Sequence, residues 1–100
     1  MYLSISTDEL AQKLKTEQLT ILDVREEPMF MAGHIPDAQH IPFSQLTDRI
    51  GELDVATDYY VICHSGVRSV QASDFLREKG FHVTNVTGGM SAWTGITAEE

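Results

Sequence analysis

The chain has 100 residues, 42% of them hydrophobic, which suits one compact domain spanning residues 1–100 and leaves no room for a second core. Its 7 basic and 15 acidic residues give a formal charge of −8, so the molecule as a whole repels nucleic acid and anionic membrane surfaces. A single cysteine excludes an internal disulfide framework, and neither a signal peptide nor an apolar run near the ~20 residues of a membrane span is evident. We therefore expect a soluble cytoplasmic protein that binds neither nucleic acid nor membranes.

Short β-type runs alternate with helical patterns along the chain. A capping box formed by Ser6 and Glu9 predicts where the first helix begins, and Gly80 is placed to end a later one. The expected elements, in chain order, are a helix from residue 6, a strand over 19–24, a short helix over 26–32, a short strand near 39–41, a helix over 43–53, a strand over 59–62, a helix through 72–79, a strand over 81–86 and a short helix over 90–93.

Strands that alternate with helices predict an α/β fold: a mostly parallel sheet with helices on both faces. Ligands of such sheets bind beyond the carboxyl ends of the strands. Cys63 directly follows the apolar strand 59–62, and Asp23 and Arg25 end the apolar strand 19–24. We therefore expect all three residues at the same edge of the sheet.

The sequence around Cys63 is typical of a reactive thiol and not of a small buried hydrophobe. Gly66 allows the backbone to curl around the sulfur, the free amide N–H groups of residues 64–69 can converge on it, and Arg68 adds a fixed positive charge. Such surroundings lower a cysteine pKa from about 8.5 to roughly 3.5–7.5. We expect Cys63 to be a thiolate nucleophile. The residues expected to bind its substrate are His64, Ser65, Gly66, Val67, Arg68 and Ser69, with Ser65 and Val67 acting through their amides.

Four blocks carry a family resemblance: residues 22–25 (LDVR), 33–38 (GHIPDA), 63–69 (CHSGVRS) and 88–93 (GGMSAW). In order and spacing they resemble the rhodanese (sulfurtransferase) domains, over nearly the whole chain. The resemblance implies a rhodanese-like parallel sheet. It also implies transfer of a sulfane sulfur from thiosulfate or a persulfide donor to a thiophilic acceptor, such as cyanide or a thiol, through a persulfide on Cys63. The implied partners are small sulfur-containing anions or thiols, or a protein sulfur donor or acceptor.

Two other activities stay open as alternatives. A non-catalytic persulfide carrier or protein-interaction module would use the same loop without turning over small molecules. A phosphatase or arsenate reductase is disfavoured by the length of the loop. Four residues lie between Cys63 and Arg68, whereas the similar loop of related cell-cycle phosphatases has one residue more. The shorter loop suits a single sulfur atom and not a tetrahedral oxyanion.

Two positions depart from the family pattern: Met29 stands where many members have Glu, and Asp37 where many have Gly. Arg25 would then lack a usual ion-pair partner, with Glu26 or Glu27 as substitutes. Because Arg68 is the only permanent cation of the loop, thiosulfate is expected to be a convenient donor and not the physiological one.

The remaining polar residues are assigned structural roles. Asp23 and Arg25 are expected to bond backbone groups at the sheet edge, and His34 to hold its own turn through a local hydrogen bond. His40 and His82 are taken as incidental. The scattered histidines and single cysteine show no metal-ligand spacing, so neither a metal nor a cofactor is expected.

Overall fold

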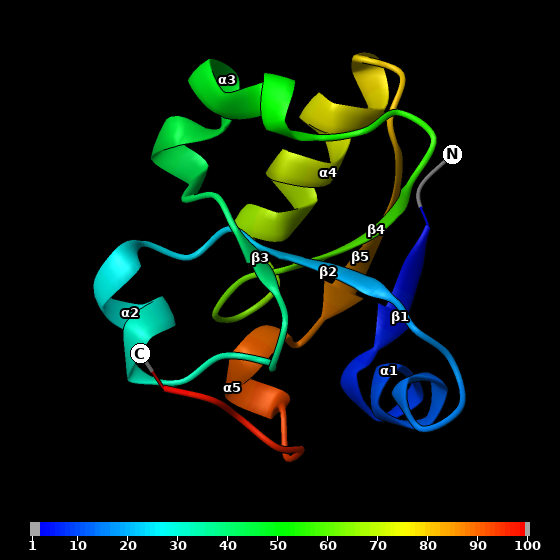
Figure 1. The fold of residues 1–100 in the computed structure, drawn as a ribbon, viewed down its shortest axis with the longest axis vertical. Helices are drawn as coiled ribbons and strands as arrows, with labels where there is room; N and C mark the ends of the chain where they lie inside the picture. The colour runs from blue at the N-terminus through cyan, green and yellow to red at the C-terminus, as the bar shows by residue number, and fades with distance from the viewer. Residues whose placement is uncertain (1–2, 100) are drawn as a thin grey trace.

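The computed structural model describes residues 3–99, which form a five-stranded sheet in the order β1-β5-β4-β2-β3 with every neighbouring pair parallel (Figure 1). The elements are β1 (Ser4–Ser6), α1 (Thr7–Leu14), β2 (Thr20–Asp23), α2 (Glu27–Ala32), β3 (Gln39–His40), the 3₁₀ turn η1 (Phe43–Gln45), α3 (Leu46–Arg49), the 3₁₀ turn η2 (Ile50–Glu52), β4 (Asp58–Ile62), α4 (Arg68–Glu78), β5 (His82–Thr87) and α5 (Gly89–Ala92). The predicted α/β class with a parallel sheet is confirmed.

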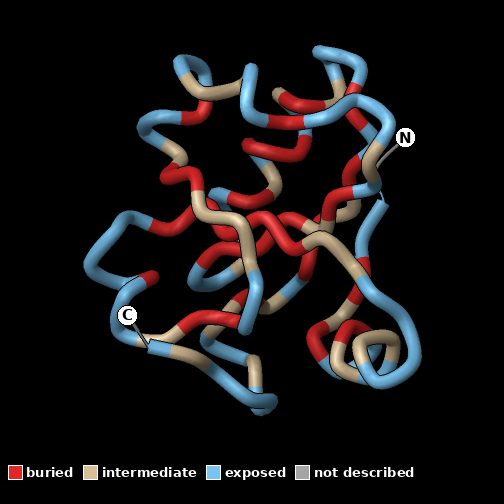
Figure 2. Tube along the Cα trace, in the orientation of Figure 1, coloured by how far each residue is buried: buried red, intermediate tan, exposed pale blue. Residues whose placement is uncertain are grey.

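Helices cover both faces of the sheet because side chains along each strand alternate between two cores. On β4, Val61 packs with residues of α3 and α4, whereas Ile62 packs with residues of α1 and α5. The buried strand segments lie at the centre of the molecule, between the helical layers (Figure 2). Trp93 packs on the core that contains Ile62, as expected from the sequence.

The two central strands end side by side. In the β2–β4 register Asp23 lies opposite Ile62, and the N–H of Val24 donates to the carbonyl of Ile62 over 3.0 Å. Cys63 therefore leaves the sheet next to the segment that carries Arg25. The expectation that both chain segments meet at the carboxyl edge is confirmed.

Local signals located several element boundaries correctly. The Ser6 hydroxyl accepts from the N–H of Glu9, and the Glu9 carboxylate accepts from the N–H of Ser6, so the predicted capping box is present. Gly80 adopts φ +94° after α4, and its N–H donates to the carbonyl of Arg77. Within residues 3–99, no helix is both long and apolar enough to cross a bilayer.

Two elements differ from expectation. Residues 4–6 form an edge strand on β5, which the sequence did not indicate because a three-residue strand carries no readable period. The helix expected over 43–53 is broken into η1, α3 and η2. None of these three short elements has a side-chain cap, and Gly51 lowers helix propensity, so continuous α-helix is not favoured there. The apolar stripe itself is correct, since Leu46 and Leu53 are buried in the core.

Candidate active site

The loop from Cys63 to Arg68 joins the end of β4 to the start of α4. It closes on itself at Gly66, whose φ of +93° lies in the region that favours glycine. A Cβ at this position would lie 3.0 Å from the backbone nitrogen of Gly88. Glycine is therefore required twice over, by backbone conformation and by close packing, which agrees with its predicted role in the turn.

The sulfur of Cys63 lies inside this loop and is surrounded by donors. The N–H of Gly66 donates to Sγ over 3.0 Å, and Ser69 Oγ lies 3.3 Å from it, within hydrogen-bond distance. Burial alone would raise the pKa of the thiol. The hydroxyl of Ser69 and the backbone N–H groups of Ser69, Gly66 and Ser65 outweigh burial and lower the pKa of Cys63. The site therefore favours a thiolate.

Helix α5 holds the other side of the loop backbone. The N–H of Met90 donates to the carbonyl of Cys63, and the N–H of Ser91 to the carbonyl of His64, each over 2.8 Å. Gly89 has φ +60°, and a Cβ there would overlap the carbonyl oxygens of Cys63 and His64. These contacts hold the backbone of the loop against α5. Residues 89–91 were not among the predicted site residues, although the block 88–93 had marked this segment.

Arg25 and Asp23 form a buried ion pair beside the loop. Arg25 Nη2 lies 2.8 Å from Asp23 Oδ2, Arg25 Nε lies 3.1 Å from each Asp23 oxygen, and Nη2 also donates to the carbonyl of Gly33. The idea that Arg25 needs Glu26 or Glu27 as a substitute partner is wrong. Asp23 supplies the partner, because the chain turns sharply after β2 and the Arg25 side chain folds back over its end.

A stack of three rings supports this ion pair. His34 and His40 lie on opposite faces of the Phe30 ring, with centroids 3.8 and 4.0 Å away. His34 Nδ1 lies 2.8 Å from the carbonyl oxygen of Phe30, the local hydrogen bond that was predicted. The view of His40 as incidental is wrong, because its Nε2 lies 2.7 Å from the carbonyl oxygen of Arg25. His82 is exposed on β5.

Asp37 adopts φ +69°, the left-handed conformation, at the position where many family members have glycine. Aspartate tolerates this region better than most residues, so the turn forms without glycine. The turn over residues 35–38 is therefore formed with aspartate at this position. The carbonyl of Ile35 still accepts the N–H of Ala38 there.

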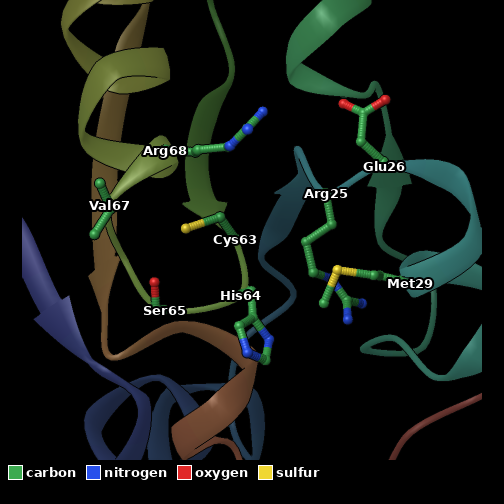
Figure 3. A pocket seen from close by; sticks show the side chains of 8 residues that line it. All are labelled: Arg25, Glu26, Met29, Cys63, His64, Ser65, Val67 and Arg68. Atoms are coloured by element: carbon green, nitrogen blue, oxygen red, sulfur yellow. The ribbon is translucent and has the colours of Figure 1, made fainter.

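A cavity of about 360 Å³ opens above Cys63 (Figure 3). Its lining residues are Arg25, Glu26, Met29, Cys63, His64, Ser65, Val67 and Arg68. Ser69 is fully buried beneath the sulfur and does not line the cavity, and neither do Asp23 and His34. The predicted residues thus divide into a cavity lining and a supporting layer.

Arg68 is the cation most exposed at this cavity. Figure 3 shows its side chain extending from the start of α4 across the opening, and its guanidinium lies 5.8 Å from the centre of the Phe43 ring. Within residues 3–99 it makes no ion pair. Among the same residues, no group of histidine, cysteine and carboxylate side chains is arranged to hold a metal ion.

The fold and this loop define a known class of domain. The model of the rhodanese-like domain family matches residues 6–96. The chain belongs to the rhodanese-like domain family.

Relatives within the family carry sulfur-transfer names. A protein of Bacillus subtilis named "Putative sulfurtransferase YtwF" is 42% identical over 93% of this chain and 91% of its own length. The thiosulfate sulfurtransferase GlpE of Shewanella oneidensis is 33% identical over 89% of each chain. A second B. subtilis protein, "Putative sulfur carrier protein YrkF", is 43% identical over 93% of this chain but only 51% of its own length.

Solved structures agree with the fold. The rhodanese-like domain protein of Staphylococcus aureus superposes with a TM-score of 0.91 at 36% identity, covering 98% of both chains. A rhodanese-related protein from Thermoplasma volcanium gives 0.91 at 33% identity over 99% of this chain and 100% of that one. Sulfurtransferase names among relatives that align along most of their length support sulfurtransferase activity for this chain.

Proposed function

We propose that this chain is a rhodanese-type sulfurtransferase that acts as a single domain and carries sulfur as a persulfide on Cys63. The Cys63 thiolate attacks the outer sulfur of a sulfane donor, a new S–S bond forms, and the old S–S bond breaks with its electron pair leaving on the donor. With thiosulfate the leaving group is sulfite. An acceptor thiolate or cyanide then removes the outer sulfur and restores the Cys63 thiolate.

The observation that carries this proposal is the set of donors around the sulfur. The Gly66 N–H and the Ser69 hydroxyl both lie within hydrogen-bond distance of Sγ, and the pKa of Cys63 is lowered. A thiolate is the nucleophilic form, and donors aimed at a sulfur anion also suit the terminal sulfur of a persulfide. In this scheme His64, Ser65, Val67 and Arg68 contact the substrate, and Asp23, Arg25 and His34 hold the loop from outside.

Loop length supports sulfur transfer over phosphoryl or arsenate chemistry. The turn closes at Gly66, whose N–H already lies 3.0 Å from the sulfur, so the donors converge on one atom. A tetrahedral oxyanion would need a wider ring of N–H groups. Cys63 is also the only cysteine of the chain, so no second cysteine of the same chain can resolve an arsenate intermediate.

A sulfur carrier is the second candidate. The relative YrkF, of which this chain spans about half, has a sulfur-carrier name, and a carrier would form the same persulfide. It would be loaded stoichiometrically but would turn over cyanide or small thiols negligibly. A reducing compartment such as the cytoplasm suits either function, because both begin from a free thiol.

The test is to incubate the protein with thiosulfate or polysulfide and measure its intact mass. Wild-type protein should gain the mass of one sulfur atom, and Cys63→Ser should gain none and lose turnover. Thiocyanate formation from cyanide then separates an enzyme from a carrier. Failure of every sulfane donor to load wild-type protein would refute the proposal, and Cys63-dependent hydrolysis of an aryl phosphate would favour the phosphatase alternative.

A further inference from the structure

A second cavity lies beside the one above Cys63. This second cavity, of about 350 Å³, is lined by Arg25, Met29, Ala32, Gly33, His64, Met90, Trp93 and Thr97. Arg25, Met29 and His64 line both cavities. The two cavities therefore adjoin at these residues. Their combined lining, here named the Met29 trough, reaches from Cys63 past side chains of α2 to Trp93.

Apolar side chains dominate the exposed surface of the Met29 trough. Met29 is 41% exposed and Val67 is 63% exposed, and these two side chains lie on opposite sides of Cys63 (Figure 3). Trp93 and Ala32 extend the apolar lining into the second cavity. A thiosulfate dianion has no apolar surface to bury against these side chains, so this lining favours a donor that carries a carbon chain.

The positive and negative side chains around the Met29 trough are equal in number, so the trough has no excess of positive charge. Asp23 neutralises Arg25 in a buried pair, and Glu26 on the cavity lining offsets the charge of Arg68. The chain as a whole carries −8. An attack on thiosulfate would bring a dianion into this field and release another one, sulfite, which the local charges do not favour.

We propose that the sulfur donor of this site is a low-molecular-mass organic persulfide, R–S–SH, whose uncharged carbon chain lies in the Met29 trough, and that Met29 determines this specificity. The proposal rests on the sulfur-transfer function proposed above. Two cavities of this size match the volume of small-molecule sites and not an extended protein interface.

The transfer step is balanced without any further reactant. The Cys63 thiolate attacks the outer sulfur of R–S–SH, forming Cys63–S–SH and releasing R–S⁻. One S–S bond forms and one breaks, the electron pair of the broken bond leaves on R–S⁻, and the proton stays on the transferred sulfur. The reacting groups carry a single negative charge before the step, on Cys63, and a single one after it, on R–S⁻. One unpaired cation, Arg68, is therefore enough to offset this charge.

The test compares donors that differ in charge and size. The probes are N-acetylcysteine methyl ester persulfide, the N-acetylcysteine persulfide that carries one carboxylate more, inorganic thiosulfate, and serum albumin persulfide. The second-order rate of Cys63 persulfide formation is followed by intact mass. For wild-type protein the methyl ester should load faster than thiosulfate and the albumin persulfide by about tenfold or more.

Met29→Lys should reverse this preference. Replacing the thioether by an ammonium removes apolar contact and adds positive charge, so the ester should slow and thiosulfate should quicken, changing the rate ratio by about tenfold or more. Met29→Leu should keep the wild-type ratio, and Met29→Gln separates lost apolar contact from added charge. Met31→Lys is the matched control, because Met31 is 42% exposed on the same helix but lines neither cavity.

The outcomes separate this inference from the proposed function. If thiosulfate or albumin persulfide loads wild-type protein at least as fast as the ester, or if Met31→Lys changes the ratio as much as Met29→Lys, the inference is wrong while sulfur transfer stands. If no donor loads Cys63, both are wrong.

Discussion

The hydroxyl of Ser69 is expected to be a main source of the Cys63 thiolate, and Ser69→Ala tests this. The hydroxyl lies 3.3 Å from Sγ, and Ser69 is fully buried, so water cannot replace it. A hydrogen bond to a charged group contributes about 1.5–3 kcal/mol, so losing it should make the acid dissociation constant of Cys63 about tenfold to hundredfold smaller. The N–H groups of Gly66 and Ser65 remain in the variant, so the lower part of this range is expected.

The assay is the rate of alkylation of Cys63 by iodoacetamide as a function of pH. Because the pKa of Cys63 is lowered, the wild-type rate should reach half its plateau below the about pH 8.5 of an ordinary cysteine. Ser69→Ala should move this midpoint to higher pH. Ser73→Ala is the matched control, since Ser73 is buried on the same helix and its Oγ has no hydrogen-bond partner within residues 3–99. An unchanged midpoint in Ser69→Ala would refute the role given to its hydroxyl.

The same shift predicts a pH dependence of stability. The folded protein loses the Cys63 proton at lower pH than the unfolded chain, so between the two pKa values the unfolded state binds more protons. The free energy of unfolding should therefore rise with pH across this window and level off above about pH 8.5. This contribution is lost as pH falls through the folded pKa. Subtracting the curve of Cys63→Ser from that of wild type in urea unfolding should isolate it, and a flat difference would contradict the lowered pKa.

Three further changes test the support of the loop and the fold. Asp23→Asn leaves the buried Arg25 without its charged partner and should lower the free energy of unfolding by about 3–5 kcal/mol, measured by urea titration. A decrease of less than about 1 kcal/mol, as for a surface ion pair, would show that the pair is dispensable. Gly89→Ala places a Cβ 2.6 Å from the carbonyl oxygen of His64 and should both destabilise the protein and slow persulfide loading, whereas normal loading would mean that α5 does not shape the loop. Ser6→Ala removes the capping box and should lower the unfolding free energy by about 1 kcal/mol with no effect on loading, which thermal unfolding and intact mass together check.

The fold class could be predicted because its signals are local. The capping box at Ser6, the apolar runs of β2 and β4 and the glycine after α4 each fall within one element, and alternation of strands and helices then leaves few topologies. The strand β1 could not be predicted, because its three residues are defined by pairing with β5 and not by their own pattern. The helix expected over 43–53 was wrong for the converse reason: its apolar period is correct, but no cap supports a continuous helix.

The site could be predicted in part. The sequence placed Cys63, Gly66 and Arg68 in one loop between a strand and a helix, and the structure brings them together there. Their catalytic and binding roles stay predictions. The partner of Arg25 was wrong, since the sharp turn that brings its guanidinium back to Asp23 is not visible in a linear sequence. His40 was overlooked because its contact with the carbonyl of Arg25 joins residues fifteen positions apart.

The sequence by itself determined which thiol is the candidate nucleophile and which loop surrounds it, since the chain has one cysteine and its neighbours, Gly66 among them, set the backbone of the loop. The tertiary structure decided what lies around that loop: the amides of α5 on its carbonyls, the Asp23–Arg25 pair beside it and the two adjoining cavities of the Met29 trough. Each of these joins segments far apart in the chain, and only the packing of helices on the parallel sheet brings them to one edge.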